Sequence, residues 1–405
     1  MKTSSGLIHL TEYETNYFPA AFFEEELAKI IWQQYSKYVT IEQPGWRNDN
    51  QWELTSSGWV GYIPIQDEIT LCLNPKVSIG NLFRMLEYAY RLNLIVVEGL
   101  YESETLDEFY ESLAKILALR VLDRKKKGLY KKYIDRREEL PYIRGRIQFQ
   151  EMYRKPWIIN IPIQYQEHTP DISDNQILNW TLFVIIRSGI CGENSISIIR
   201  RAYRELQRIV EQYPYSPQDC INRFYDRLNE DYKPMHALCR FFLENSGPTI
   251  TLGEHSMMPF LINMDKLFEL FVAEWLRTNL PENYQLVSQE HIKFGTTGKI
   301  HFEIDLVISE IESGKVKYVL DTKYKAPDSP SSPDIHQIVA YGEAKNCKEA
   351  ILIYPEKLKS PFNGLIGEIN LRTLTFPIDG DLEDAGEKFV SELLFEQDVL
   401  LNKTF

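Results

Sequence analysis

An acid and an amine lie two positions apart at the end of an apolar run, in the stretch YVLDTKYK that begins at Tyr318. The apolar lead-in is typical of a strand covered on both faces, where a charge costs several kcal/mol unless it is paired or bound to a metal ion. Because strand side chains alternate, Asp321 and Lys323 leave the same face about 7 Å apart, and Thr322 points the other way. The sequence therefore predicts an ion pair or a cation site at the end of a buried strand.

A second acid, Asp305, precedes this stretch on another predicted strand. The segments HFEIDLVISE and VKYVLDTKYK are separated by the turn residues Ser313 and Gly314. Apolar runs joined by such a turn predict a β-hairpin. We therefore expect the strand that carries Asp305 to lie next to the strand that carries Asp321.

Two predicted helices flank this hairpin in the sequence. Asn263 can cap a helix over MDKLFELFVAEWLRTNL, and Glu269 lies at the edge of its apolar stripe. Downstream, the hydroxyl of Ser332, followed by proline and aspartate, is typical of a helix start. The helix DIHQIVAYGEAKN then places Gln337 and Tyr341 on one face, before the short buried strand AILIYP. The order is helix, strand, strand, helix, strand.

The remainder of the chain divides by its periodicity. Residues 1–80 contain short alternating runs broken by turn residues, as in WELTSSGWVGYIPIQDEITLCLNPKVSIG, and are predicted to be mainly β. Residues 81–248 show a helical period, with one strand expected near Tyr142–Phe149. The segment NSGPTITLGEHSMMP is typical of a linker. We therefore expect a multidomain α+β protein, with a β-rich and then helical half over 1–248 and an α/β domain over 249–405.

Composition excludes several classes of protein. The net charge of −13 argues against coating nucleic acid by bulk electrostatics. The five cysteines form no CxxC pair, so neither a disulfide framework nor a zinc or iron–sulfur site is indicated. No apolar stretch approaches the roughly 20 residues of a membrane helix, and MKTSSGLIHLTEYE has no apolar signal core. We expect a cytoplasmic protein with no membrane partner.

One segment departs from the acidic average. Residues 120–146 hold 11 Lys or Arg against 4 Asp or Glu, with Lys125, Lys126 and Lys127 in a row. A solvated helix face and a surface for phosphates or an acidic partner both fit this composition.

The motif residues, in this order of elements, resemble the PD-(D/E)XK nuclease superfamily, whose core motif appears here as Asp305 and Asp321-Thr322-Lys323. Further segments resemble, in the same order, the landmarks of the McrC family, the nuclease subunits of McrBC modified-cytosine restriction systems. They are LNPKVSIGNLFRMLEYAY, YIRGRIQF and HTPDISDNQILNWTL in the first half, and DKLFELFV, IDLVI, LDTKYK and DIHQIVAYG in the second. Ile304 stands where McrC-like chains commonly have proline.

The resemblance implies a DNA endonuclease that depends on Mg²⁺, or alternatively Mn²⁺. Asp305 and Asp321 are the implied metal ligands, with Thr322 assigned to the same metal site. Carboxylates suit this role because their hard oxygens bind Mg²⁺ without removing all its water. Glu303 shares a strand face with Asp305 and competes with it as a ligand.

Three more residues receive roles from the same resemblance. Lys323 is expected to hold, or help deprotonate, the attacking water. Glu269 is expected to complete the metal shell through water, and Gln337 to orient Lys323 or the phosphate. Non-catalytic interpretations also remain open. Asp321 and Lys323 can form a surface ion pair, and Glu269 and Gln337 can have structural roles.

The resemblance also implies a partner AAA+ GTPase ring that recognises modified DNA, with residues 1–248 docking to the ring and stimulating its hydrolysis. The chain has no GxxxxGK[ST] motif, so nucleotide-driven work must come from another chain. Two rival functions remain open. One is a standalone DNA repair or recombination nuclease that binds DNA through residues 120–146, and the other is a non-catalytic adaptor.

Overall fold

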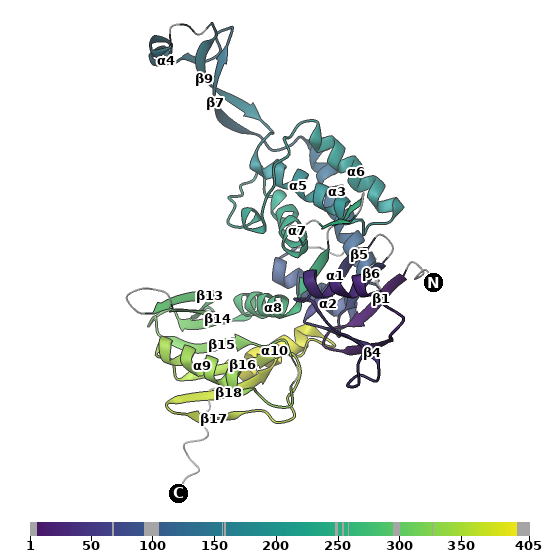
Figure 1. Ribbon diagram of the computed structural model, residues 1–405. Coiled ribbons are helices and arrows are strands. Elements are labelled where there is room, and N and C mark those ends of the chain that lie inside the picture. Colours follow the sequence, from purple (N-terminus) through teal and green to yellow (C-terminus); the bar gives the residue numbers. More distant parts are fainter. Residues whose placement is uncertain are drawn as a thin grey trace. The chain divides into compact units, whose positions relative to one another are not determined.

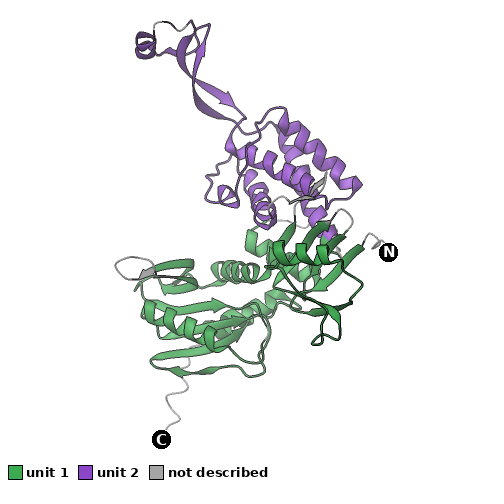
Figure 2. Cartoon of the chain, viewed as in Figure 1, with its two compact units in different colours: residues 1–106, 251–255, 259–405 green, residues 107–250, 256–258 purple. Residues whose placement is uncertain are grey.

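The computed structural model describes residues 6–66, 69–92, 105–155, 157, 159–247, 250–252, 255–257, 259–294, 300–325 and 327–394. Backbone contacts divide the chain into two compact units (Figure 2). Unit 1 comprises residues 1–106, 251–255 and 259–405, and unit 2 comprises residues 107–250 and 256–258. In sequence, unit 2 is therefore an insertion within unit 1.

The largest sheet of unit 1 has six strands in the order β13-β14-β15-β16-β18-β17 (Figure 1). They are β13 (Tyr284–Phe294), β14 (Ile300–Glu310), β15 (Val316–Thr322), β16 (Glu349–Tyr354), β17 (Asn363–Ile366) and β18 (Ile369–Thr375). The pairs β13–β14, β14–β15 and β17–β18 are antiparallel, whereas β15–β16 and β16–β18 are parallel. The predicted hairpin of two acid-bearing strands is confirmed as β14 and β15.

Three helices pack against this sheet. They are α8 (Met264–Asn279), which contacts β13 and β15, α9 (Ser332–Lys345), which contacts β15, β16 and β18, and α10 (Leu382–Leu394), which contacts β18 and α8. Since β15 and β16 are parallel, α9 is the crossover that connects them. Val319 packs in one core cluster with Ile338 of α9, and Leu320 points to the opposite face. Both strand residues are fully buried, so β15 is covered on both faces as predicted.

A close contact fixes α10 on α8. A Cβ added to Gly386 of α10 would lie 2.0 Å from ring carbon Cζ2 of Trp275, whose side chain is almost fully buried. Only glycine allows this approach, because protein interiors are close-packed.

The N-terminal sheet explains why residues 1–106 belong to the same unit as the C-terminal residues, although the main segment of unit 2 ends at residue 250, near the predicted boundary at 248. Its order is β1-β6-β5-β12, with β1 (Gly6–Thr11), β6 (Ile69–Asn74), β5 (Trp59–Gln66) and β12 (Phe260–Asn263). The fourth strand thus comes from the far side of the insertion, and α2 (Ile79–Tyr90) contacts α8. At Gly61 a Cβ would lie 1.9 Å from the Phe260 carbonyl oxygen, so β5 and β12 can approach only because this residue is glycine. Long-range strand pairing therefore joins residues 1–106 to the C-terminal sheet, which the local composition of the linker did not reveal.

A smaller sheet in unit 1 has the order β2-β4-β3, with β2 (Thr15–Pro19), β4 (Gln51–Ser56) and β3 (Val39–Glu42). Helix α1 (Glu25–Gln34) packs on β3 and β5. Its buried residues Leu27, Ala28 and Ile31 follow the three- and four-residue spacing of an amphipathic helix.

Unit 2 combines a group of helices with a three-stranded sheet (Figure 1). Its helices are α3 (Leu106–Lys127), α4 (Phe149–Arg154), α5 (Ser173–Ser188), α6 (Glu193–Gln207), α7 (Tyr232–Asn245) and the short 3-10 helix η1 (Pro217–Cys220). Its sheet has the order β7-β9-β8, with β7 (Lys132–Leu140), β9 (Ile161–Thr169) and β8 (Arg146–Ile147). The strand expected near Tyr142–Phe149 is reduced to β8, which is an edge strand of this sheet. In the sequence, the longer strands β7 and β9 precede and follow it. A two-stranded sheet joins β10 (Ile250–Leu252) and β11 (His255–Met257).

Local expectations were met with small shifts. Asn263 caps α8, with its side-chain oxygen accepting a hydrogen bond from the Lys266 amide at 3.0 Å. Helix α9 is capped by Ser331 and not by Ser332, because the Ser331 hydroxyl accepts from the Asp334 amide. The mixed α+β class is confirmed. Of the helices in the described ranges, none has the length and apolar character needed to cross a membrane.

Candidate active site

The two predicted aspartates face each other at one end of the hairpin. In the β14–β15 register, Leu306 pairs with Leu320. Asp305 immediately precedes the first of these residues and Asp321 immediately follows the second, so antiparallel pairing brings them opposite each other. On its other side β15 pairs with β16, where Asp321 is opposite Leu352. Asp321 therefore lies on an interior strand of the sheet.

Asp305 is held by the backbone and side chain of Thr322. The Thr322 amide and hydroxyl donate to Asp305 Oδ2 at 2.8 and 2.9 Å. Burial raises the pKa of Asp305, although these two hydrogen bonds oppose the shift. Strand alternation placed Thr322 on the face away from Asp321 and Lys323, but its hydroxyl reaches the neighbouring strand at the end of β15. The hydroxyl is thus occupied with Asp305.

Asp321 is a fully buried carboxylate that can still accept a hydrogen bond or bind a cation. Its Oδ2 forms an ion pair with Lys323 Nζ at 2.7 Å, and its Oδ1 has no hydrogen-bond partner among the described residues. Burial and the nearby charge of Asp305 raise the pKa of Asp321 to about 7. A buried acceptor without a partner is costly, so this oxygen is suited to a cation.

Lys323 connects the strand end to helix α9. It lies one residue beyond β15, and its amide donates to the Ile353 carbonyl at 2.8 Å. Its Nζ also donates to Gln337 Oε1 at 3.2 Å, and Gln337 Nε2 donates to the Tyr341 hydroxyl at 2.7 Å. Burial disfavours the ammonium form, but the Asp321 carboxylate outweighs this and raises the pKa of Lys323. The amine is therefore charged and fixed in position.

The two glutamates considered from the sequence differ in their surroundings. Glu269 is half-buried on α8, and burial together with the charge of Asp305 raises its pKa to about 7. Glu303 is exposed and lies opposite His291 on β13, 4.0 Å from His291 Nε2. The geometry therefore brings Asp305, Asp321, Lys323 and Gln337 together, puts Glu269 within electrostatic reach, and turns Glu303 toward another partner.

The donor set fits a hard divalent cation that keeps part of its water. Across the described ranges, no three His, Cys, Asp or Glu side chains form a group that could hold a metal ion. Two aspartates with a free carboxylate oxygen match Mg²⁺, which proteins commonly bind through one or two carboxylates plus water and substrate phosphates. The residues present thus fit a site in which the protein shares the coordination of Mg²⁺ with water and substrate. They do not form a closed cage for a structural metal.

Sequence reasoning missed a buried contact beside this site. The Tyr324 hydroxyl donates to Glu12 Oε1 at 2.7 Å, and the Lys76 amide donates to the same oxygen at 2.8 Å. Glu12 is fully buried, and burial raises its pKa. A single acid after an alternating strand gave no local signal for this role, since Glu12 and Tyr324 are 312 positions apart.

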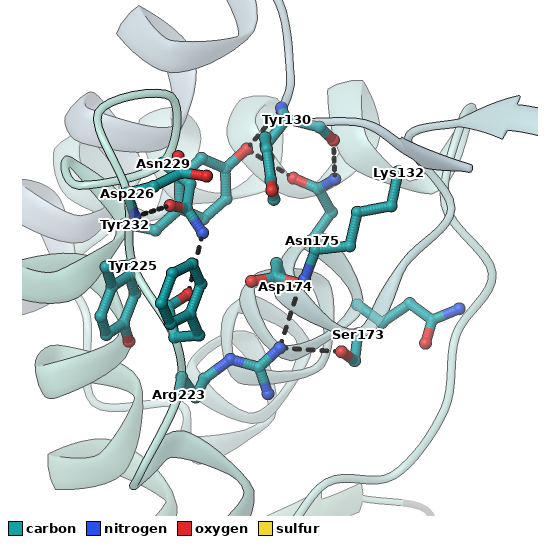
Figure 3. A network of polar contacts seen from close by, with 12 residues as sticks. Tyr130, Lys132, Ser173, Asp174, Asn175, Arg223, Tyr225, Asp226, Asn229 and Tyr232 are labelled. Atoms are coloured by element: carbon teal, nitrogen blue, oxygen red, sulfur yellow. Dashed lines mark hydrogen bonds and ion pairs between the residues drawn. The ribbon is translucent and has the colours of Figure 1, made fainter. Parts of the chain in front are cut away.

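A second polar cluster, in unit 2, is stabilising in character (Figure 3). The buried Asp174 contacts Lys132 at 2.9 Å and Arg223 at 3.1 Å. Burial opposes ionisation, but the two cations hold the pKa of Asp174 below its usual value. Asn175 donates to the Tyr130 carbonyl and accepts from the Tyr232 hydroxyl. Because Tyr130 and Lys132 lie at the start of β7, the cluster anchors the three-stranded sheet to the helices.

The basic run is partly neutralised by its own unit. Lys125 contacts Glu205, and Lys127 contacts Asp123 at 2.7 Å within α3. Arg124 lies 3.4 Å from Asp231. These pairs favour the solvated-face interpretation for this end of α3, and Lys126 is the residue of the row with no such pair among the described residues.

Comparisons with known proteins agree with one another. The chain is 24% identical over 211 residues to the type IV methyl-directed restriction enzyme EcoKMcrBC of Escherichia coli strain K12, an alignment over 51% of this chain and 60% of that protein. A chain from the half-complex of Thermococcus gammatolerans McrB AAA+ hexamers with bound McrC has the same fold, with a TM-score of 0.55 and 17% identity over 96% of this chain and 99% of that one. A chain of the Thermococcus gammatolerans McrBC complex aligns over 68% of this chain and 89% of its own length, with 17% identity and a TM-score of 0.43. The family model described as McrBC 5-methylcytosine restriction system component matches residues 54–355.

Proposed function

Because this chain belongs to the family of McrBC 5-methylcytosine restriction system components, we propose that it is the DNA-cleaving subunit of such a complex. The reaction is metal-dependent hydrolysis of a phosphodiester bond in DNA. The C-terminal sheet with α8 and α9 is the corresponding PD-(D/E)XK nuclease core.

One observation supports this proposal above the others. Asp321 is fully buried, opposite a second carboxylate, and keeps one oxygen without a partner while the other contacts an ammonium group. The structural ion pair of Asp174 also leaves its Oδ1 without a hydrogen bond, but despite burial two cations lower the pKa of Asp174. Asp321 differs because burial and the opposite carboxylate of Asp305 raise its pKa to about 7. Perturbed carboxylates clustered with a charged partner are typical of functional sites.

Each residue of the site has a role in the proposed reaction. Asp305 and Asp321 hold Mg²⁺ or Mn²⁺, and the bound ion supplies charge neutralisation at the phosphate and an acidified water. Thr322 fixes the Asp305 carboxylate through its amide and hydroxyl. Lys323 positions the attacking water or the phosphate, and it is aimed by its hydrogen bond to Gln337. Such preorganised charges act on the transition state without reorganisation.

Glu269 has an outer role in the same proposal. Burial, and then the charge of Asp305, raise its pKa to about 7, which indicates a carboxyl that exchanges a proton near neutrality. We assign it to water molecules of the metal shell, because it forms no three-carboxylate group with the two aspartates. Glu303 is not assigned a ligand role.

The proposed partner is an AAA+ GTPase ring like McrB, whose hydrolysis this subunit stimulates. Support comes from the T. gammatolerans relative, which is bound to McrB AAA+ hexamers. Unit 2 offers a surface that fits protein docking, because large apolar side chains are exposed on and around β8, α4 and the segments that flank them. They include Tyr142, Ile143, Phe149, Tyr153, Trp157 and Ile159. Exposed apolar patches of this kind mark interaction sites.

The catalytic test uses single substitutions in the full chain with its partner. Asp305→Ala, Asp321→Ala and Lys323→Ala should each reduce DNA cleavage by roughly 10²-fold or more. The matched control is Asp328→Ala, since Asp328 is an exposed aspartate whose carboxylate pairs with Lys359. Binding of each variant to the ring, measured in parallel, separates loss of chemistry from loss of assembly. Wild-type cleavage by all three site variants would remove the assignment.

Metal and partner dependence test the remaining parts of the proposal. Mg²⁺ or Mn²⁺ should support cleavage and Ca²⁺ should not, because its larger and looser shell positions water poorly. Full activity in EDTA would exclude the two-carboxylate mechanism. Efficient cleavage by the chain alone, without a GTPase, would instead favour the standalone nuclease.

A further inference from the structure

A cavity in the N-terminal part of unit 1 is not used by the proposed nuclease. It has a volume of about 560 Å³ and lies between helix α1 and the sheet β2-β4-β3. Its polar and aromatic lining comprises Glu25, Glu26, Lys29, Trp32, Gln43 and Trp52. The volume is within the range of roughly 300–1,000 Å³ that is usual for small-molecule sites.

The two indoles of this cavity have opposite degrees of exposure. Trp52 on β4 is 4% exposed, and its ring nitrogen donates to the Ala20 carbonyl at 3.1 Å, which fixes the ring. Trp32 on α1 is 63% exposed. Trp46 and Trp157 are more exposed still, but Trp32 differs from them because it lines the cavity. Trp32 is therefore available as a flat surface for a ligand.

The polar side chains of the cavity are free to bind a ligand. Within the described part of the chain, the side chains of Glu25, Glu26, Lys29 and Gln43 have no hydrogen bond or ion pair. Glu25, Lys29 and Trp32 recur at spacings of four and three, so they share one face of α1. This face is distinct from the one that buries Leu27 and Ile31. A carboxylate, an amine and an indole thus line the same cavity without partners.

We propose that this cavity binds a nucleobase that carries an exocyclic amino group, as cytosine and adenine do, within a nucleotide or a DNA strand. The indole of Trp32 provides a stacking face, which any base can use. Carboxylates only accept hydrogen bonds, so Glu25 and Glu26 select an amino group and repel the carbonyl that thymine presents there. The Gln43 amide can both donate and accept, and so can pair with a ring nitrogen beside the amine.

The lysine favours this ligand over an alkylammonium cation. Aromatic rings with carboxylates also form cages for methylated amines. Lys29 offsets one of the two carboxylates in the lining and gives the phosphate of a nucleotide an ion-pair partner, which an alkylammonium cation cannot use. All six of these lining residues precede residue 54, where the match to the family model begins. The inference therefore adds a base-binding site to the proposed nuclease and does not depend on cleavage.

The test measures equilibrium binding to the full chain in EDTA, so that no substrate is cut. Labelled ten-residue oligo-dC and oligo-dT are compared by fluorescence anisotropy, and cytidine and uridine monophosphate by calorimetry. The wild-type chain should prefer the cytosine ligand in at least one of these pairs. Binding of cytidine monophosphate indicates that a free nucleotide suffices, and binding of oligo-dC alone indicates a base within DNA.

Variants locate the binding in the cavity. Trp32→Ala should weaken the cytosine ligand by about tenfold, from the stacking contribution of ~1–3 kcal/mol per base. The matched control is Trp46→Ala, because Trp46 is 86% exposed and does not line the cavity. The double change Glu25→Gln with Glu26→Gln should reduce the preference for cytosine over thymine or uracil, whereas Glu24→Gln should leave it intact. Thermal unfolding confirms that each variant is folded.

Three results would overturn the inference. The first is unchanged cytosine binding in Trp32→Ala, and the second is equal loss in Trp46→Ala. The third is a site that binds tetramethylammonium but neither nucleotide nor oligonucleotide, since that is an amine cage. Each result is independent of whether Asp321 supports DNA cleavage, which the cleavage assay measures separately.

Discussion

Replacing Asp321 by asparagine should change how the free energy of unfolding depends on pH. The carboxyl has a pKa of about 7 in the folded chain, against the usual 3.8 of an aspartate side chain. Between these values it is protonated when folded and ionised when unfolded. Its contribution to stability is therefore full below about pH 4 and is lost as the pH rises to about 7. Asparagine cannot ionise, so Asp321→Asn avoids this loss.

The interval between the two pKa values sets the magnitude. At about 1.4 kcal/mol for each pH unit, the interval from 3.8 to about 7 corresponds to roughly 4 kcal/mol at most. The substitution also removes the partner of Lys323, which adds a cost. That cost is counted against the protonated carboxyl of the folded wild type, and the ionisation of Asp321 is already included in the interval above, so it adds no further dependence on pH. The free energy of unfolding of Asp321→Asn should therefore rise relative to that of the wild type as the pH rises. This difference should level off above about pH 7.

Urea unfolding at pH 5, 6, 7 and 8 in EDTA, followed by circular dichroism, measures this difference. Asp328→Asn is the matched control, since the Asp328 side chain is 76% exposed. Mg²⁺ at pH 8 should then stabilise the wild type and leave Asp321→Asn unchanged, because the ion relieves the cost of the ionised carboxylate. A flat difference between Asp321→Asn and wild type from pH 5 to 8 would refute the reasoning.

Three further substitutions test the packing and polar contacts of the two units, each by chemical unfolding. Gly386→Ala should destabilise by about 1–3 kcal/mol because its Cβ meets a buried indole, whereas Gly80→Ala, also helical but with open space around it, should be neutral or stabilise by up to about 1 kcal/mol; equal effects would contradict the packing argument. Tyr324→Phe should cost about 1–3 kcal/mol because it removes a hydrogen bond to the buried carboxylate of Glu12, and an unchanged unfolding midpoint would show that this contact adds nothing. Asp174→Asn should cost about 3 kcal/mol in unit 2 because two cations lose their buried partner, and a loss confined to unit 1 would exclude that role.

Short-range pattern was enough to predict the elements of the candidate site. Strands β14 and β15 were predicted because their apolar runs flank a turn, and α8 was predicted with its cap at Asn263. The pairing of Gln337 with Tyr341 followed from helical spacing alone, and the two side chains are hydrogen-bonded. Local spacing fixes these relations because the residues share one element or adjoin across one hairpin.

Contacts between distant segments were beyond the reach of those patterns. Strand β12 pairs with β5 about 200 positions away, and this pairing puts residues 1–106 in one unit with the C-terminal sheet. The Glu12–Tyr324 contact has the same origin, since its two residues are 312 positions apart. Strand alternation predicted that Thr322 points away from the face of Asp321. Because Thr322 is the last residue of β15, its hydroxyl nevertheless reaches Asp305 on the neighbouring strand.

The sequence by itself determined the groups of the candidate site: two aspartates on neighbouring strands, a lysine just beyond one of these strands, and a glutamine on the next helix. The spacing of these residues along the strands and the helix follows from their order in the sequence, so it could be predicted without a structure. Only the tertiary structure decided their electrostatic state, because burial beneath packed helices and the opposition of two carboxylates raise the pKa of Asp321 to about 7. That environment is built by segments far apart in the chain, and no local pattern encodes it.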